Sequence, residues 1–335
     1  MTTAAARPTM RDVASKAGVS LKTVSRVIND EPSVAAHTAT RVSEAIAELG
    51  FQRNDLARSL RSGQSSSTLG LIIEDVANPF YSAIAQSVEA VSRDRGYLLI
   101  TASALEDADR ERELVTVLLR RRVDALLVVP AGPDHRYMSD DLGRTSAVFL
   151  DRPPARIEAD TVLLDNAGGA RQAIEHLLGQ GHVRIACVCD SADLYTAGER
   201  LSGYRATLAA AGIAEDPALV LSGNRDATEA RDAVDRLLAL PEDRRPTGIF
   251  AANNRNTVGA LHALHWAHRA VALVGFDDFE LADLLGVTVV RSDPAAMGTV
   301  AATLAFARLD GDDRPTQRLT IPTTLITRGT GETAL

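Results

Sequence analysis

The sequence predicts a chain of two parts: a small all-α unit, followed by a larger α/β unit that is built as two lobes. The stretch before Ser62 shows only helical patterns and ends in a serine-rich run. From Leu69 onward, nearly continuous apolar stretches alternate with amphipathic ones, which is typical of parallel sheets covered by helices on both faces. This pattern begins again after Asp160, so we expect two α/β lobes with a cleft between them.

The first part opens with the pattern of two short helices. Thr9, with Asp12 three positions later, fits a capping box, and Gly18 can end that helix in the left-handed conformation. Ser20 can cap a second helix, whose apolar stripe consists of Val24, Val27 and Ile28. Another face of it carries Lys22, Arg26 and Asn29. The pattern predicts a DNA-binding helix-turn-helix, and a helical hairpin with a solvated charged face is the alternative.

Three further segments complete this part. Residues 33–49 predict a third helix, with Gly50 past its end, that closes a three-helix core. The segment from Asn54 to Leu60 can form a helix, but it is too short to be stable alone and must fold on a partner. The run from Ser62 to Thr68 predicts a flexible tether at the domain boundary.

Nine apolar stretches in the second part predict strands. In chain order they read TLGLII, YLLITAS, ALLVVP, SAVFL, TVLL, RIACVC, ALVLS, GIFAA and VALVGF. Helices are expected from about Pro79 and over residues 107–121. Polar side chains stand where several of these strands stop: Glu74, Asp75, Asp151, Arg152, Asn253 and Asp277. Ligands bind beyond the carboxyl ends of parallel strands, so we expect these side chains to line one cleft, although each alone could cap a helix or make a turn.

Charge and composition narrow the class of protein. The chain has 335 residues and a formal net charge of −8, but residues 1–63 hold nine Lys/Arg and six Asp/Glu, a net +3. A basic end on an acidic body indicates a nucleic-acid-binding arm. No apolar run reaches the roughly 18 residues that span a bilayer, and the first residues lack a signal peptide. We therefore expect neither export nor membrane insertion.

No metal site or catalytic constellation is expected. Cys187 and Cys189 could be half a metal site, but without further ligands a buried strand in reducing cytosol is favoured. His262, His265 and His268 lie close to one helical face without an acidic or cysteine partner. The motifs HExxH, GxxxxGK[ST] and GxSxG are absent, and the glycine pair at 168–169 is a weak phosphate-loop signal. We expect no cofactor and no enzyme activity.

The first part resembles the DNA-binding headpiece of the LacI/GalR family of bacterial transcription regulators, through VASKAGVS, KTVSRVIN and NDLARSLRSG. The remainder is similar to the family's effector domain, which is like periplasmic sugar-binding proteins. Matching stretches include GLIIEDVANPFY, FLDRP, ERLSGYRATLAAAGI, AANNRNTVGAL and VGFDDFELAD. The resemblance implies a helix-turn-helix headpiece over residues 1–53, a hinge helix and linker over 54–68, and an effector domain over 69–335. Its lobes are expected at about 69–161 with 292–318, and 162–291 with 319–335.

The resemblance also implies which residues contact DNA. Leu21, Lys22 and Arg26 are expected to read bases. Further contacts in the headpiece are Thr9, Ser20, Thr23, Ser25 and Asn29. In the hinge segment they are Asn54, Ala57, Arg58 and Leu60. Two hinge segments would pack through Ala57 and insert Leu60 into the minor groove, while the alternative is that Leu60 covers the first lobe.

For the effector, the resemblance places Phe80 and Tyr81 against the ligand and Asp151 and Arg152 at the hinge side of the cleft. Its polar edge would be bound by Arg200, Asn253 and Asp277. Carboxylate acceptors, a forked arginine donor and an aromatic face suit a polyhydroxylated sugar. Alternatively, Tyr81 could pack the first lobe and Arg200 could form a surface ion pair.

Several positions depart from the family pattern. Leu194 stands where the purine-binding branch has a second arginine, so a purine corepressor is not expected. Asn224 or Arg225 stands where the lactose branch has an aromatic platform, which argues against a lactose-like galactoside. Asn254 replaces a usual aspartate. No leucine heptad follows the effector domain, so the resemblance implies a dimer and not the tetramer of the lac repressor.

The headpiece departs as well. Ala35, Ala39 and Arg53 replace a usual serine, arginine and proline. Losing the serine cap costs about 1 kcal/mol. We expect weaker phosphate contacts than is usual in the family, with the base-reading residues intact.

Together these observations predict a cytoplasmic, homodimeric transcription factor, acting as a repressor, that binds palindromic operator DNA and responds to a sugar or polyol. One alternative is a sugar-binding protein that serves a transporter, against which the missing export signal and residues 1–63 argue. The other is a sugar-modifying enzyme on the same fold, against which the missing acid, base and nucleophile motifs argue.

Overall fold

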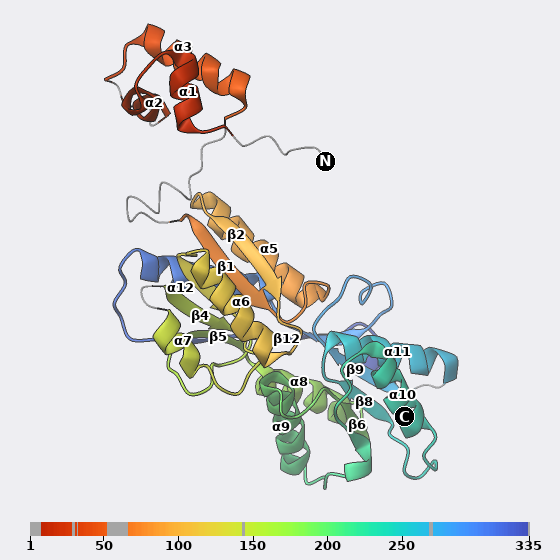
Figure 1. The fold of residues 1–335 in the computed structure, drawn as a ribbon. Coiled ribbons are helices and arrows are strands. Elements are labelled where there is room, and N and C mark those ends of the chain that lie inside the picture. The colour runs from red at the N-terminus through yellow and green to blue at the C-terminus, as the bar shows by residue number, and fades with distance from the viewer. Residues whose placement is uncertain are drawn as a thin grey trace. The chain divides into compact units, whose positions relative to one another are not determined.

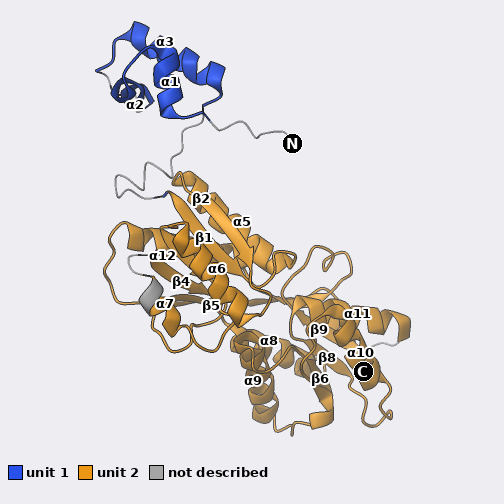
Figure 2. Ribbon diagram, viewed as in Figure 1, with its two compact units in different colours: residues 1–66 blue, residues 67–335 orange. Residues whose placement is uncertain are grey.

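The computed structural model describes residues 8–28, 31, 33–51, 66–142, 145–267 and 271–333. The chain forms two compact units, residues 1–66 and residues 67–335 (Figure 2). The predicted combination of a small helical unit with a two-lobed α/β unit is confirmed. No helix within the described ranges combines the length and the apolar character that are needed to cross a bilayer.

The described residues of the first unit form three helices (Figure 1): α1 Met10–Ala17, α2 Leu21–Ile28 and α3 Ala36–Leu49. The predicted capping box is present, because Thr9 N donates to Asp12 Oδ2 at 2.7 Å while Asp12 N donates to Thr9 Oγ1 at 3.4 Å. Gly18 and Gly50 end α1 and α3 in the left-handed conformation, at φ of 62° and 61°. Glycine adopts this conformation without a Cβ penalty, so both predicted helix ends are confirmed.

The second helix begins where predicted and packs by its apolar stripe. Ser20 Oγ accepts a hydrogen bond from Thr23 N at 3.1 Å. Val24 is fully buried in the core that the three helices share. The third helix begins three residues later than predicted, and Ala35 at its N-cap makes no side-chain hydrogen bond. Arg41, on α3, donates a hydrogen bond from its Nη2 to the carbonyl of Ala17, and this contact joins α3 to the end of α1.

The first lobe contains a six-stranded parallel sheet in the order β11-β5-β4-β3-β1-β2. Its strands are β1 Thr68–Ile73, β2 Leu98–Ser103, β3 Ala125–Val128, β4 Ser146–Leu150, β5 Asp160–Leu164 and β11 Arg318–Ile321. Its helices are α5 Pro79–Asp94, α6 Ala108–Arg120, α7 Arg136–Asp141 and α12 Pro294–Leu309. Parallel strands need covered faces, which these helices supply.

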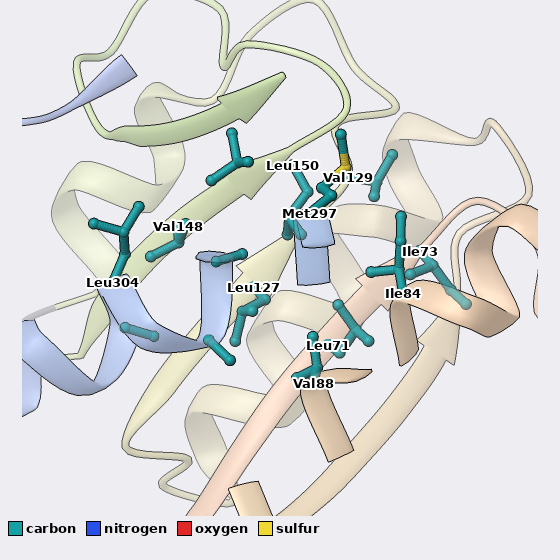
Figure 3. Close-up of a cluster of buried hydrophobic side chains, with 14 of the residues drawn as sticks. Leu71, Ile73, Ile84, Val88, Leu127, Val129, Val148, Leu150, Met297 and Leu304 are labelled. Atoms are coloured by element: carbon teal, nitrogen blue, oxygen red, sulfur yellow. The ribbon is translucent and has the colours of Figure 1, made fainter. Parts of the chain in front are cut away.

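Alternate residues of β1 point to the two faces of this sheet. Leu71 and Ile73 pack with Ile84 and Val88 of α5 in one buried cluster, which Figure 3 shows. Ile72 belongs to the cluster on the opposite face, together with α6. The near-continuous apolar strands in the sequence therefore reflect a sheet that is buried on both sides.

The second lobe repeats this arrangement, in the order β12-β10-β9-β8-β6-β7, with β12 antiparallel to β10. Its strands are β6 Ile185–Val188, β7 Val220–Leu221, β8 Gly248–Ala251, β9 Ala272–Phe276, β10 Thr288–Arg291 and β12 Thr324–Ile326. Its helices are α8 Asn166–Gly179, α9 Tyr195–Ala210, α10 Ala227–Leu238, α11 Asn254–Ala267 and the 3-10 turns Pro217–Leu219 and Thr330–Glu332. Cys187 and Cys189 are free and buried, which confirms the interpretation of that stretch as a core strand.

The predicted boundaries between the lobes are wrong in two places. Residues 162–164 and 319–321 were expected in the second lobe, but β5 pairs with β4 and β11 in the first sheet. The chain therefore changes lobe after Leu164, between β10 and α12, and between β11 and β12. The strands β10, β11 and β12 are missing from the nine predicted, because they are short and two of them are only partly buried.

Candidate functional site

A cavity of about 730 Å³ lies between the two lobes, where strands of both sheets end. It is lined by all seven side chains that the sequence proposed for the effector: Phe80, Tyr81, Asp151, Arg152, Arg200, Asn253 and Asp277. Glu74, predicted at a strand end, lines it as well. The expectation that strand-end polar residues share one cleft is therefore confirmed for these positions, while their role in binding stays a prediction.

Asp151 is held at the end of β4 by its backbone and by Tyr81. It adopts a left-handed φ of 64°, and Tyr81 Oη donates to its Oδ2 at 3.0 Å. Burial raises the pKa of the Asp151 carboxyl group and opposes the attraction of Arg152. Among the described residues, no group donates to Asp151 Oδ1. The first lobe thus offers the cleft a buried acceptor oxygen.

Tyr81 and Phe80 serve two purposes. Both belong to the buried cluster of the first lobe, so the alternative that Tyr81 packs the lobe is also correct. Their rings meet edge to face, with centroids 5.1 Å apart. Burial, together with the charge of Asp151, raises the pKa of Tyr81 well above its usual value, so its hydroxyl group remains a donor.

Arg152 is fixed by acceptors of the same lobe. Its Nη1 and Nη2 donate to the two carboxylate oxygens of Glu106 at 2.6 and 2.5 Å, and Nη1 also donates to the Pro130 carbonyl at 3.1 Å. Glu106 itself has a left-handed φ of 59°. Sequence reasoning missed Glu106, because a loop glutamate far from Arg152 in the chain gives no local signal.

Arg200 is the centre of the second lobe's wall. Its Nε donates to Asn166 Oδ1 at 2.7 Å, its Nη1 donates to the Ala252 carbonyl at 2.6 Å, and Asp277 Oδ2 lies 3.5 Å from Nη1. The guanidinium group also stacks over the Phe276 ring, 3.7 Å from its centroid. Arg200 is only 5% exposed, so the alternative of a surface ion pair is wrong.

Asp277 and Asn253 complete this wall. Asp277 follows β9 with a φ of 65° and accepts a hydrogen bond from Ser292 Oγ at 2.5 Å. Asn253 Oδ1 accepts from Asn256 N at 2.7 Å and so starts α11. The capping alternative for Asn253 is therefore correct for its side-chain oxygen, and the residue also lines the cleft.

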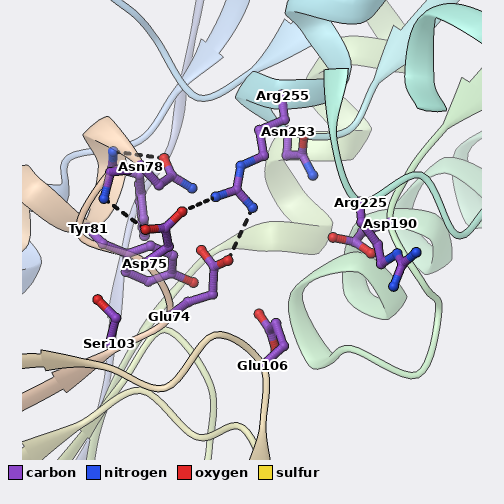
Figure 4. A network of polar contacts seen from close by, with 12 residues as sticks. Glu74, Asp75, Asn78, Tyr81, Ser103, Glu106, Asp190, Arg225, Asn253 and Arg255 are labelled. Carbon is purple, nitrogen blue, oxygen red and sulfur yellow. Dashed lines mark hydrogen bonds and ion pairs between the residues drawn. The ribbon is translucent and has the colours of Figure 1, made fainter. Parts of the chain in front are cut away.

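Polar contacts join the two lobes directly, as Figure 4 shows. Arg255, at the start of α11, donates to Glu74 Oε1 at 3.1 Å and to Asp75 Oδ2 at 2.8 Å. Asn254 Nδ2 donates to Asn78 Oδ1 at 2.8 Å. Sequence reasoning named Asn254 only as a departure and missed Arg255. Both residues directly follow the strand-end Asn253, and this position in the sequence could have indicated that they lie near the cleft.

Three other positions singled out in the sequence differ in their access to the cleft. Leu194 and Arg225 line it, so the departures from the purine and lactose patterns concern the ligand site. Asn224 is buried, and its Nδ2 donates to the carbonyls of Cys189 and Leu221.

The glycine pair at 168–169, a weak phosphate-loop signal in the sequence, lies at the start of α8. Gly168 N donates to Asp165 Oδ1 at 2.9 Å, so a side chain of the protein caps this helix.

The predicted DNA-contacting surface lies on α2. Leu21 is 46% exposed, although it is apolar, and Lys22 beside it is exposed. Arg26 Nε lies 3.5 Å from Glu31 Oε2 in a half-exposed ion pair. Ser25 is half-buried, while Thr9, Ser20 and Thr23 take part in helix caps. Asn29, Asn54, Ala57, Arg58 and Leu60 lie outside the described residues.

The described part of the chain contains no group of three or more His, Cys, Asp or Glu side chains that is arranged to hold a metal ion. His262 and His265 lie on α11, and His268 lies outside the described residues.

Comparison with known proteins identifies the class of protein. Residues 9–54 match the model for bacterial regulatory proteins of the lacI family, and residues 174–330 match a periplasmic binding protein-like domain. The chain belongs to the LacI family of bacterial regulatory proteins. The prediction of a DNA-binding transcriptional regulator with a helix-turn-helix headpiece is confirmed.

Individual relatives are similar over nearly the whole chain. The ribose operon repressor of Escherichia coli (strain K12) is 32% identical over 330 residues, which cover 96% of this chain and 99% of the relative. The transcriptional regulator GalR of the same organism is 33% identical, and the match covers 93% of this chain and 92% of GalR. A solved structure of the lac repressor dimer bound to operator and the anti-inducer ONPF superposes with a TM-score of 0.82 at 25% identity, over 97% and 99%. A complex of the regulator CelR with cellobiose gives a TM-score of 0.71 at 31% identity, over 97% and 100%.

Proposed function

We propose that this regulator is a homodimeric repressor whose affinity for a palindromic operator is set by a sugar or a related small polar metabolite. The observation that carries this proposal is the set of side chains that line the cleft. Seven side chains from two lobes, predicted separately from the sequence, line a single cavity and present carboxylate, guanidinium, amide and aromatic groups to it. This combination suits hydroxyl groups that both donate and accept.

Named relatives support a sugar as the effector. One relative is a ribose operon repressor, and the solved structure of the regulator CelR is a complex with cellobiose. The transcriptional repressor PurR of Aliivibrio fischeri (strain MJ11) is also similar, at 28% identity. However, this chain has Leu194 at the cleft where a second arginine would be needed, so we favour a sugar or polyol over a purine.

An apolar surface in the second lobe supports dimer formation. Leu281, Leu284 and Leu285 are 54%, 79% and 54% exposed. Adjacent exposed leucines favour burial against another protein surface. A relative is described as a dimer on its operator. We expect sedimentation to give a dimer, and Leu284→Asp to shift it toward the monomer.

The hinge segment from Asn54 to Leu60 lies outside the described residues, and its role remains a prediction. In this proposal, two copies order only on DNA, and Leu60 enters the minor groove and bends the duplex. A ligand that changes the angle between the lobes would bias this ordering step. Leu60→Ala should reduce DNA bending and leave effector affinity without DNA unchanged, and unchanged bending would rule out the wedge.

The proposed function is tested by DNA selection followed by effector screening. The full-length protein should enrich a two-fold symmetric sequence from a random library, because protein symmetry is mirrored in the operator. Sugars and polyols are then screened by thermal shift, since a ligand at 100 times its dissociation constant stabilises the folded state by about 2.7 kcal/mol. A sugar that changes operator affinity supports the proposal. Failure to enrich any symmetric sequence contradicts it.

The protein is proposed to act in the cytoplasm, where its DNA target lies, and to bind its ligand without turnover. The named relatives are an operon repressor and a transcriptional regulator. Incubating the protein with each sugar that binds, and analysing the sugar afterwards, separates binding from catalysis. Chemical conversion at a rate above that of the Asp277→Asn variant would favour the enzyme alternative.

A further inference from the structure

The arginines of the cleft are already neutralised by carboxylates of the protein. Each of the four that line it has an acidic partner within 3.5 Å: Arg152 with Glu106, Arg200 with Asp277, Arg225 with Glu229, and Arg255 with both Glu74 and Asp75. Three of these arginines are buried or half-buried, so their positive charge is paired away from water. An anionic ligand would have to compete with these carboxylates.

Carboxylates outnumber arginines in the lining of the cleft. Six acidic residues line it: Glu74, Glu106, Asp151, Asp190, Asp193 and Asp277. Asp190 forms no ion pair with any described residue, and the only hydrogen bond assigned to its carboxylate comes from Ser191 N at 2.7 Å. Asp151 Oδ1 is buried and has no donor among the described residues. Asp190 lines the cavity and is half-buried, so its carboxylate keeps acceptor capacity for a ligand, whereas Asp151 Oδ1 is buried in the wall.

Acidic side chains of opposite walls also repel one another. Burial raises the pKa of Glu74 in the first lobe; Arg255 opposes this effect, and the charges of Glu106 and Asp75 add to it. Burial likewise raises the pKa of Asp190 in the second lobe, and Glu106, across the cleft, adds to it. Glu106 of the first lobe and Asp190 of the second thus place like charges on opposite walls of the cleft.

We propose that the effector is an uncharged polyol, or an amine derived from one, and that the cleft rejects phosphorylated and carboxylated ligands. Asp190 accepts hydrogen bonds from hydroxyl or ammonium groups of the ligand. This inference rests on the proposed function and narrows the class of its effector. It makes Asp190, which the sequence did not single out, a specificity-determining residue.

We expect the cleft to reject anionic ligands because binding one would separate buried ion pairs, which costs free energy. A phosphate monoester carries about −1.5 to −2 charges at pH 7. To reach Arg152 it must displace Glu106, which would leave a carboxylate without its partner in a poorly solvated site. A neutral hydroxyl group makes no such demand, because it can donate to Asp190 while the ion pairs stay intact.

Matched ligand sets test this inference by calorimetric titration of the full-length protein at constant ionic strength. One set is ribose with ribose 5-phosphate, and another is glucose with glucosamine, glucose 6-phosphate and gluconate. Where a neutral sugar binds, we expect its anionic derivative to bind at least about tenfold more weakly, a factor that corresponds to about 1.4 kcal/mol. An anionic member that binds more tightly than its neutral parent overturns the inference.

A charge variant separates repulsion from steric exclusion. Asp190→Asn keeps the size of the side chain and removes its charge, so it should narrow the gap between neutral and phosphorylated sugars by about fivefold or more. Asp232→Asn is the matched control, because it removes an equal charge from an exposed residue of α10 outside the cleft. An unchanged gap in Asp190→Asn means that shape alone excludes the phosphate, and the inference is wrong.

The outcomes for this inference and for the proposed function are distinguishable. If only anionic ligands bind and release the operator, the inference is overturned while the regulator function stands. If a selected operator is bound but no tested ligand of any charge changes its affinity, both are overturned.

Discussion

Asp151 and Asp277 occupy equivalent positions in the two lobes. Each follows the third strand of its sheet, β4 or β9, in a left-handed conformation with φ of 64° and 65°. The backbone N–H group of each donates across the sheet at 2.9 Å, to the carbonyl of Val162 and of Val290 respectively. The lobes therefore bring two corresponding carboxylates to the cleft from opposite sides.

This left-handed backbone makes a prediction for Asp277. Asparagine tolerates positive φ while alanine is penalised by about 1 kcal/mol or more, and alanine also leaves Arg200 without its carboxylate. We expect Asp277→Ala to lower the free energy of unfolding by about 2–4 kcal/mol, and Asp277→Asn to lower it by less. Urea titration measures both. Asp277→Asn should also abolish the effector's influence on operator affinity, and equal destabilisation by the two variants would contradict the role of the backbone.

The contacts between Arg255 and the first lobe predict a change in effector affinity. Arg255→Ala removes two ion pairs that favour approach of the lobes, so the open arrangement should become more populated and the effector should bind about three- to tenfold more weakly. Overall stability should change by about 1 kcal/mol or less, because the arginine side chain is 32% exposed. Arg231→Ala, which removes an exposed arginine outside the cleft, is the control. Equal effector affinity in both variants, measured by calorimetry, would exclude this role.

The sequence was sufficient for the parts of the fold that depend on local patterns. Apolar runs gave most strands and the start of α5 at about Pro79, and the caps Thr9 and Ser20 with the helix-ending Gly18 gave the helix-turn-helix. The lobe boundaries depend instead on which strands pair. Periodicity shows that residues 160–164 are a buried strand, but not that β5 lies between β4 and β11. Pairing is a long-range property that no local pattern encodes.

The same distinction holds for the candidate site. Asp151, Arg200 and Asp277 could be predicted because the motifs that contain them are specific, and strand-end position gave Glu74. Glu106 could not be predicted, because its role arises only from the ion pair with Arg152, 46 positions away in the chain.

A buried carboxylate outside the cleft predicts acid-dependent stability. Burial disfavours the charge of Glu111, but His135, whose Nε2 lies 3.3 Å from its Oε1, and hydrogen bonds from Tyr137 and Ala131 N outweigh this effect, so its pKa lies below the usual 4.5. A depressed carboxyl pKa stabilises the fold above the unfolded-state pKa, and this stabilisation is lost as the pH falls through the folded-state pKa.

Glu111→Gln should therefore lower the free energy of unfolding by about 1.5–3 kcal/mol at pH 7, and the deficit should shrink below about pH 4.5. Urea unfolding at pH 7, 5 and 4 measures this difference. A deficit that is constant across this range would mean that the packing of Glu111, and not its charge, stabilises the fold.

The exposed face of α2 predicts a base-specific contact. Arg26→Ala should weaken binding to the selected operator by about 1–3 kcal/mol and relax the preference at one base pair in each half-site. Lys16→Ala is the comparison, since Lys16 lies on α1 and pairs with Glu48 of α3. Fluorescence anisotropy with single-base operator variants checks this. Equal losses on operator and random DNA would mean that Arg26 contacts only phosphate.

The chain crosses between the lobes three times, and this order of segments affects the protein during synthesis. Met297, Ala301 and Phe306 of α12 cover the same face of the first sheet as Leu71 and Val148, yet α12 is translated only after most of the second lobe. At 5–20 residues per second, the ribosome needs roughly 7–30 s to advance from residue 164 to residue 309. During that interval α5 covers only part of this apolar face, so the nascent chain exposes apolar surface that chaperones can bind long before it can bind an effector.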